Sequence, residues 1–252
     1  MKKVCHLLIL SAAMVVSALA QAAAQKPDAK PEALPSADQI IEKYVQASGG
    51  KAALEKCTSR FSKGSLEVPA FSVGGPLEIY SKAPNKSIFK ADIQGFGVVQ
   101  QGYDGKTAWS QDPQSGLREL AGGELSDAKL GAEFHKTTRF KELYPKLTVK
   151  SKEKVGDHEA YLLEATPKEG ASEKWYFDVQ TGMPIRVDVE RHGPEGSVSI
   201  SQYFENYKMV DGVNLPFSIR QERPDFAIVL KFEEIKNNVP VDEAKFAKPA
   251  AQ

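Results

Sequence analysis

Residues 173–190 read EKWYFDVQTGMPIRVDVE, and this stretch decides the fold class. Apolar and polar side chains alternate over residues 174–179 and again over residues 185–190, with Gln180-Thr181-Gly182 between the two runs. A period of two places the apolar side chains on one face of an extended strand. Two such runs around a small polar turn are typical of an antiparallel hairpin. The stretch therefore predicts two paired strands with one apolar and one solvated face.

The same alternation extends outward in both directions, from Ser59 to Phe232. Asp104-Gly105 and Asp211-Gly212 each separate two alternating runs. An Asp-Gly pair in this position is the signature of a two-residue hairpin turn. The whole region predicts about ten to twelve short strands joined by hairpin loops.

Helical patterns occur before the strands and at one point among them. Ser36 and Gln39 form a capping box ahead of an apolar run of helical period, and Gly49-Gly50 ends that run. Residues 51–57 predict a second short helix. Residues 126–144 predict a third, which its first two residues, serine and aspartate, would cap.

This grouping of elements predicts an α+β protein dominated by one antiparallel sheet. No Pro/Gly/Ser-rich linker interrupts residues 59–247, so residues 36–249 are expected to form a single domain. A sheet with one apolar face has three ways to cover it. It closes into a barrel, packs against helices, or holds an apolar ligand.

The N-terminus has the layout of a secretory signal peptide. Two lysines precede an uncharged apolar run from Leu7 to Ala20, which ends in the small-x-small pattern Ala18-Leu19-Ala20. The run is short for a membrane span, so an uncleaved anchor is the less favoured alternative. We expect residues 1–20 to be removed and residues 21–35, rich in Ala, Gln, Lys and Pro, to be a disordered spacer. No cysteine stands directly after the cleavage region, so no lipobox is present, and we predict a periplasmic protein.

Composition and charge exclude several classes of protein. The chain has 252 residues with 41% hydrophobic, 33 Lys+Arg and 33 Asp+Glu. A balanced charge offers no basic field for nucleic acid. Beyond the predicted signal peptide Cys57 is the one cysteine, so no internal disulfide is expected. Its thiol is either reactive or simply buried, and free cysteines are usually packing residues.

A search for catalytic and cofactor motifs yields nothing. His135, His158 and His192 are isolated, without metal-ligand spacing. Gly95-Phe96-Gly97 lacks the third glycine of a dinucleotide fingerprint, and the chain has neither a nucleophile elbow nor a phosphate-binding loop. We therefore predict no metal, no cofactor and no catalytic residue. Carboxylates distant in the sequence could still meet in the fold.

The positive signal is the apolar face of the sheet. It is rich in large side chains, which are the candidate ligand-binding residues of an apolar cavity: Leu77, Ile79, Phe89, Ile93, Trp109, Leu163, Trp175, Phe177, Ile185, Val187, Phe217, Ile228 and Leu230. Periodicity alone favours the simpler interpretation, in which these side chains fill the interior, because apolar stripes are usually core.

The order of these elements resembles the LolA/LolB-like superfamily of envelope lipoprotein carriers. The resemblance lies in the helix at residues 37–45, the turn Tyr103-Asp104-Gly105 before Trp109, and the hairpin from Trp175 to Ile185. It continues in the tail, where Phe-x-x-Ile-x-x-Asn-x-x-Val-x-x-x-x-Phe spans residues 232–246. The resemblance covers most of residues 36–249.

The resemblance implies a single curved antiparallel sheet that forms an unclosed barrel, with helices as a lid. It implies a periplasmic protein that binds lipid acyl chains, or lipoproteins through those chains, for carriage or sorting towards the outer membrane. The lid would be the helices in residues 37–57, the helix at 126–144, or both. The lid-contacting arginine of the family has two candidates here, Arg60 and Arg139.

Two other functions stay open at this point. One is an envelope sensor or adaptor of the same fold that binds a membrane-protein partner, with Tyr203, Phe204 and Tyr207 as a contact face. The other is a hydrolase with distant residues assembled in the cleft, and a loss of activity on replacing His135 or His158 would support it.

Overall fold

The computed structural model describes residues 33–193 and 196–250. The chain divides into two units, Met1–Ala33 and Leu34–Gln252, and everything below concerns the second. The predicted signal peptide and most of the predicted spacer lie outside the described residues. No helix in the described part of the chain is both long and apolar enough to cross a membrane.

The described chain forms one antiparallel sheet of thirteen strands, in the order β6-β5-β4-β3-β2-β1-β13-β12-β11-β10-β9-β8-β7. Neighbours in this order are consecutive in sequence except at the centre, where β1 pairs with β13. The strands are β1 (Ser59–Val68), β2 (Val73–Lys82), β3 (Lys86–Ile93), β4 (Gly97–Tyr103), β5 (Ala108–Asp112), β6 (Gly116–Glu119), β7 (Lys146–Val155), β8 (His158–Thr166), β9 (Glu173–Asp178), β10 (Pro184–Gly193), β11 (Gly196–Val210), β12 (Val213–Glu222) and β13 (Ala227–Asn237).

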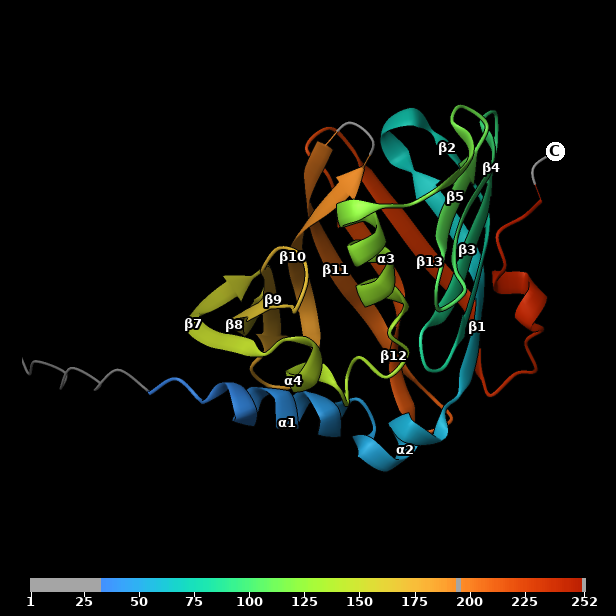
Figure 1. Ribbon diagram of the computed structural model, residues 1–252. Coiled ribbons are helices and arrows are strands. Elements are labelled where there is room, and N and C mark those ends of the chain that lie inside the picture. The colour runs from blue at the N-terminus through green and yellow to red at the C-terminus, as the bar shows by residue number, and fades with distance from the viewer. Residues whose placement is uncertain (1–32, 194–195, 251–252) are drawn as a thin grey trace, which may run out of the picture. The chain divides into compact units, whose positions relative to one another are not determined.

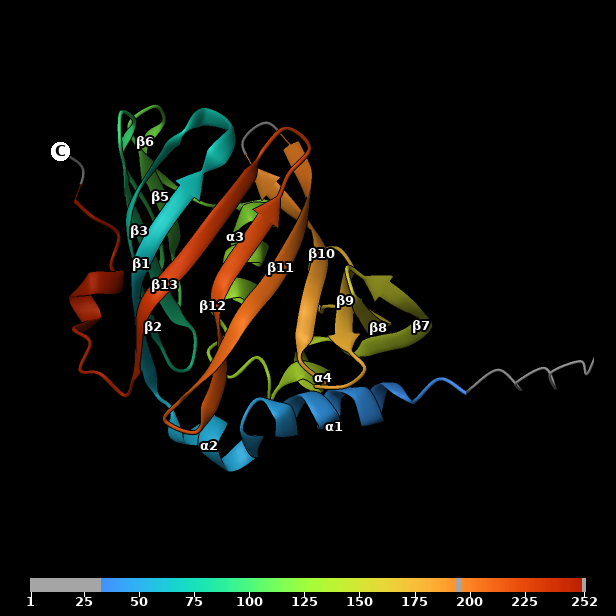
Figure 2. The same ribbon diagram turned by 180° about the vertical axis from the view of Figure 1, so that it is seen from behind.

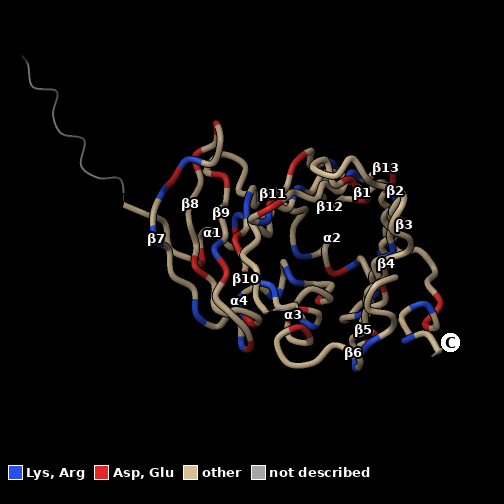
Figure 3. The backbone as a smooth tube through the Cα atoms, turned by 90° about the horizontal axis from the view of Figure 1, so that it is seen from above, with Lys and Arg blue, Asp and Glu red and all other residues tan. Residues whose placement is uncertain are grey.

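The sheet is curved but not closed, because its edge strands β6 and β7 do not pair with each other. Figure 3 looks along the curve, with β7–β9 at one end and β5–β6 at the other. This confirms the predicted α+β fold with an unclosed antiparallel barrel, with one strand more than the upper predicted number.

Four helices accompany the sheet: α1 (Ala37–Ala47), α2 (Gly50–Lys56), α3 (Gly122–Ala132) and α4 (Phe140–Leu143). Figure 1 shows α3 in front of the strands β10–β13, and Figure 2 shows it behind them from the opposite side. The helix contacts β4 and β5 on one side and β10 on the other. It therefore spans the concave side of the sheet, while α1 and α4 lie against its β7–β9 end (Figure 1).

The start of α1 is the predicted capping box. The Ser36 hydroxyl accepts a hydrogen bond from the Gln39 amide at 3.2 Å, and the Ser36 amide donates to the Gln39 side chain at 2.8 Å. Gly49 follows the helix at φ 118°, and a Cβ there would lie 2.0 Å from the Gly212 carbonyl oxygen. Only glycine allows this approach of the α1–α2 turn to the β11–β12 turn.

The predicted helix over 126–144 is wrong in its extent. The structure has α3, which begins at Gly122, and the four-residue α4, with the segment 133–139 between them. The predicted N-caps lie inside α3, where the Asp127 carboxylate instead accepts a hydrogen bond from the His192 amide at 2.8 Å. The connecting segment is held by tertiary contacts, such as the Phe134 amide to the Pro84 carbonyl at 3.0 Å. These contacts override the local helical pattern.

One of the two predicted Asp-Gly turns has the expected length. Asp211 and Gly212 form a two-residue turn with φ 51° and 82° between β11 and β12. The loop from β4 to β5 has four residues instead of two, because the Asp104 carboxylate accepts hydrogen bonds from the Lys106 and Thr107 amides at 2.8 and 2.7 Å. This side chain stabilises a longer turn.

Candidate functional site

The concave face of the sheet carries a space of about 570 Å³ with a mainly apolar lining, which we call the apolar cavity. It lies between α3 and the strands β1–β4 and β13. Its volume is within the range of small-molecule sites in proteins. Its apolar lining residues are Leu66, Val68, Ile79, Phe89, Ile93, Val99, Ile228 and Leu230.

Strand register explains why these side chains converge. Ile79 of β2 lies opposite Phe89 of β3, and Leu66 of β1 lies opposite Leu230 of β13. Residues directly opposite in an antiparallel pair point to the same face. Side chains of the five strands β1–β4 and β13 thus supply one apolar wall, and the fully buried Leu77 packs with them as part of the same cluster.

The helix α3 covers this cavity with small side chains. Ala128 and Gly131 are its apolar contribution to the cavity lining. Polar contacts hold the helix on two sides: Glu124 accepts two hydrogen bonds from Arg118, each 2.7 Å, and Asp127 lies 3.0 Å from His192 Nδ1. The helix also has an apolar contact, because Ala128 and Ala132 are buried in one cluster with Tyr103, Ala108 and Leu120.

Five of the thirteen candidate residues line the apolar cavity: Ile79, Phe89, Ile93, Ile228 and Leu230. Leu77 belongs to the same cluster. Four others, Leu163, Trp175, Phe177 and Val187, lie on the other half of the concave face, in a cluster we call the aromatic core.

Protein side chains pack closely in the aromatic core, although Trp175 and Val187 also line the cleft next to it. Trp175 and Phe177 stack at 5.9 Å between ring centroids, and Phe140 of α4 meets Trp175 edge-on at 5.0 Å. Tyr44 of α1 lies 5.3 Å from Phe177. The helices α1 and α4 therefore occupy the concave face here with their own side chains.

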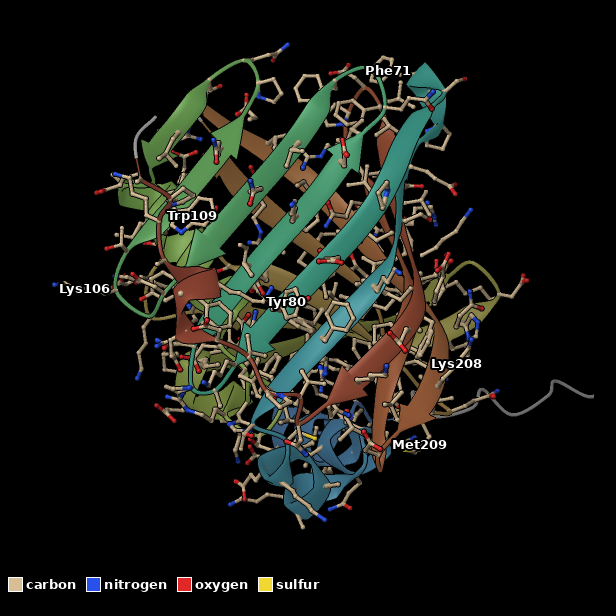
Figure 4. All side chains as sticks on the ribbon, turned by 90° about the vertical axis from the view of Figure 1, so that its right-hand side faces the viewer. Phe71, Tyr80, Lys106, Trp109, Lys208 and Met209 are labelled. Atoms are coloured by element: carbon tan, nitrogen blue, oxygen red, sulfur yellow. The ribbon has the colours of Figure 1, made fainter. Side chains whose placement is uncertain are left out.

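Two candidate residues do not face the concave side, which corrects the prediction for them. Trp109 pairs with Gly102, lies over it on the outer face, and donates to the Phe246 carbonyl at 3.1 Å. Figure 4 shows it beside the C-terminal turn. Ile185 packs with Tyr176 in a separate outer cluster. An irregularity in register beside Ile185 breaks the alternation on which its prediction rested.

The last candidate, Phe217, lies outside both clusters. It packs near the α2 end of the sheet with Val213 and Leu215, beside the buried Cys57. The Lys208 ammonium lies 4.4 Å from its ring centroid. Cys57 itself is a free thiol with 2% exposure, as the packing interpretation predicted, and burial raises its pKa.

A second space of about 330 Å³, which we call the polar chamber, adjoins the apolar cavity. The two share Gln101, Asp127, Gln221 and Arg223 in their linings. Sequence reasoning missed this chamber. The sequence did contain a sign of it: Gln101 and Gln221 are polar residues at strand positions whose alternation directs the side chain to the concave face.

A third space of about 310 Å³, the basic cleft, lies between α1, the segment 133–139 and the strands β9–β12. Arg60 and Lys136 both line it, and burial lowers the pKa of each. Glu173 also lines it and accepts hydrogen bonds from Tyr144 at 2.6 Å and Trp175 at 2.9 Å.

Of the two arginines considered for contact with the lid, Arg60 joins the sheet to the helical segment. Its guanidinium lies 5.5 Å from the Phe134 ring centroid, and its Nε donates to Asn237 at 2.9 Å. Arg139 pairs with Glu133 and Glu142, close to it in sequence.

The histidines of the described residues have structural partners. His135 Nε2 lies 2.8 Å from the Cys57 carbonyl oxygen, and His158 Nδ1 lies 2.8 Å from Asp178. No group of three His, Cys, Asp or Glu side chains that could hold a metal ion occurs among the described residues.

Comparison with known proteins identifies the fold. No protein-family model and no curated protein matches the chain. Among solved structures, a LolA superfamily protein from Nitrosomonas europaea superposes with a TM-score of 0.56 and 17% identity, over 85% of this chain and 99% of that one. A DUF1329 family protein from Desulfovibrio piger gives 0.57 and 14%, over 83% and 96%. A domain named for outer membrane lipoprotein sorting, from Vibrio parahaemolyticus, gives 0.55 and 14%, over 84% and 98%.

These similarities define the class of fold: an unclosed antiparallel barrel with helices on its concave side. The chain has the LolA-like fold, as its sequence predicted.

Proposed function

We propose that this protein is exported to the periplasm and binds lipid acyl chains, or lipoproteins through those chains, in the apolar cavity beneath α3. One observation carries the proposal: an apolar space of about 570 Å³ lies on one half of the concave face. The other half of the face carries the aromatic core, with the smaller basic cleft beside it. The sheet therefore supports both a packed interior and an unfilled, ligand-sized cavity.

The energetics suit an acyl chain. Each methylene removed from water contributes about 0.8 kcal/mol. A chain of about twelve carbons would thus gain several kcal/mol from apolar contact alone, before the cost of ordering it is subtracted. Such binding needs shape and apolar surface but no reacting group.

Release would follow from movement of α3. Opening would break the Glu124–Arg118 and Asp127–His192 pairs, which lie at partly exposed positions. Ion pairs in such places typically contribute about 0–1 kcal/mol. Full opening would also expose the buried Ala128 and Ala132 and break the hydrogen bond from the His192 amide to Asp127, so its cost includes these contacts.

Native mass spectrometry of protein purified from a bacterial periplasm tests the proposal. We expect a bound mass, and extraction should identify it as a lipid or an acylated peptide. A mass equal to the bare chain, unchanged after incubation with envelope lipids, would overturn the proposal. Ile228→Asp, with its substitution in the cavity wall, should abolish the bound mass.

The alternative, an adaptor face at Tyr203, Phe204 and Tyr207, is compatible with the placement of these residues, because all three line one space. Phe204 and Tyr207 line the basic cleft, and the Tyr207 hydroxyl donates to the Pro184 carbonyl at 2.7 Å. Tyr203 is covered by the guanidinium of Arg220, 4.0 Å from its ring centroid. All three are partly buried, and they line one space of about 620 Å³ together with Ile185 and Arg220.

A further inference from the structure

Three buried polar atoms without a hydrogen-bond partner among the described residues line the polar chamber. They are Ser110 Oγ, Arg118 Nε and Arg223 Nε. They come from β5, from β6 and from the residue after β12, which are separate parts of the sheet. Buried polar atoms in folded proteins are paired in the great majority of cases. Three in one chamber indicate a surface arranged for a polar group that is not part of the chain.

The charges around the chamber leave one cation unpaired. Arg118 is neutralised by Glu124 through two hydrogen bonds of 2.7 Å. Arg191 lies 3.4 Å from Glu173 and 3.8 Å from Asp127.

Arg223 has no ion pair with any described residue. Its backbone amide donates to the Phe226 carbonyl at 2.9 Å, and its guanidinium lies 5.7 Å from the Phe226 ring centroid. Burial lowers the pKa of this guanidinium. A half-buried guanidinium without a counter-ion would be stabilised by a ligand that supplies the negative charge.

The position of Arg223 connects this charge to the apolar cavity. Arg223 lines both the apolar cavity and the polar chamber, as do Gln101 and Gln221. A ligand with an apolar chain in the first space would place its polar end in the second. Arginine recognises phosphate and carboxylate through paired N–H donors.

We propose that the polar chamber binds the anionic headgroup, a phosphate or carboxylate, of an amphiphile whose acyl chain occupies the apolar cavity, with Arg223 as the charge partner. This inference rests on the proposed function and narrows it to anionic acyl ligands. Gln101 and Gln221 would flank the junction between chain and headgroup, and Ser110 would offer a further hydroxyl.

Calorimetric titration of the delipidated full chain with matched probes tests the inference. Dodecyl phosphate and 1-dodecanol carry the same chain and differ in headgroup charge, and both are used below their aggregation concentrations. We expect dodecyl phosphate to bind at least about tenfold more tightly, the size of effect that a hydrogen bond to a charged group supplies. Equal affinities would overturn the headgroup site while leaving acyl-chain binding in place. If neither probe binds, the proposed function fails as well.

Arg223→Gln should remove the preference for dodecyl phosphate and change 1-dodecanol binding less than about twofold. The matched control is Arg220→Gln, which removes the same charge three residues away on the outer face, where Arg220 stacks on Tyr203. Equal losses in the two variants would show a general charge effect and overturn the assignment. Should Arg223→Gln fail to fold, Arg223→Lys keeps the cation, and its loss of all preference would contradict a charge-based site.

Inorganic phosphate alone distinguishes the two sources of an oxyanion. We expect it to bind far more weakly than dodecyl phosphate and to leave the 1-dodecanol titration unchanged. Phosphate binding as tight as that of dodecyl phosphate would show a site for the free anion, and the amphiphile assignment would be wrong.

Discussion

The same substitution at three apolar positions should separate cavity wall, outer face and filled core. Ile228→Asp places a carboxylate in the wall of the apolar cavity, Ile185→Asp places it on the outer face, and Phe177→Asp places it in the aromatic core. Phe177 is 1% exposed. Truncation of such a residue costs about 3–5 kcal/mol, and an unpaired buried carboxylate adds to this cost. The total is comparable with the ~5–15 kcal/mol stability of a typical domain.

Ile228 is only partly buried, because its side chain faces the cavity. A carboxylate there keeps some hydration, so we expect a loss of about 1–2 kcal/mol in unfolding free energy. Contact with about three or four methylenes of a bound chain would be lost, or about 3 kcal/mol, which corresponds to roughly a hundredfold weaker binding.

Urea unfolding followed by circular dichroism measures the stabilities, and titration with 1-dodecanol measures binding. We expect Phe177→Asp to unfold, Ile228→Asp to fold but lose the ligand, and Ile185→Asp to fold and bind normally. Equal destabilisation at Ile228 and Phe177 would show that no cavity exists at Ile228. Normal binding by Ile228→Asp would place the ligand elsewhere.

Three further predictions follow from particular contacts. Hydrogen bonds from Lys82 and Lys86 lower the pKa of Glu243 to about 2. Because this folded-state pKa lies below the unfolded one, the contribution of Glu243 to folding stability is present above the unfolded pKa and is lost as the pH falls towards 2. NMR titration of the carboxyl group should detect the low midpoint. Gly49→Ala should lower the melting temperature by several degrees, because its Cβ would lie 2.0 Å from the Gly212 carbonyl oxygen, and unchanged melting would contradict the required close approach. Phe71 is 63% exposed in the β1–β2 turn and is labelled in Figure 4. If this exposed ring contacts the membrane, Phe71→Ser should slow ligand uptake from phospholipid vesicles with less than a twofold change in affinity for 1-dodecanol. An unchanged uptake rate would exclude Phe71 from membrane contact.

Local patterns predicted the elements whose contacts are local. The Ser36 capping box and the Asp211-Gly212 turn depend on residues within a few positions of each other, so the sequence contains the whole interaction. The alternation in 173–190 predicted two strands because one face of each is buried. Register irregularities are not encoded in this alternation, which is why Ile185 was assigned to the wrong face.

The division of the concave face into a filled half and an unfilled half was not predictable from the sequence. Phe89 and Phe177 have the same alternating context in sequence, yet Phe177 is covered by α1 and α4 and Phe89 lines a cavity. The difference depends on where helices distant in sequence pack. The position of Trp109 was unpredictable for the same reason, because it is covered by a segment at Phe246, far along the chain.

Photo-crosslinking tests the location of the ligand most directly. A dodecanoic acid with a diazirine at its terminal carbon would be bound to the full chain, irradiated, and the labelled peptides identified by mass spectrometry. We predict labels on the strands that carry Ile79, Phe89 and Ile228, the walls of the apolar cavity. Labels confined to the β8–β9 strands of the aromatic core, or to the outer face beside Trp109, would contradict this prediction.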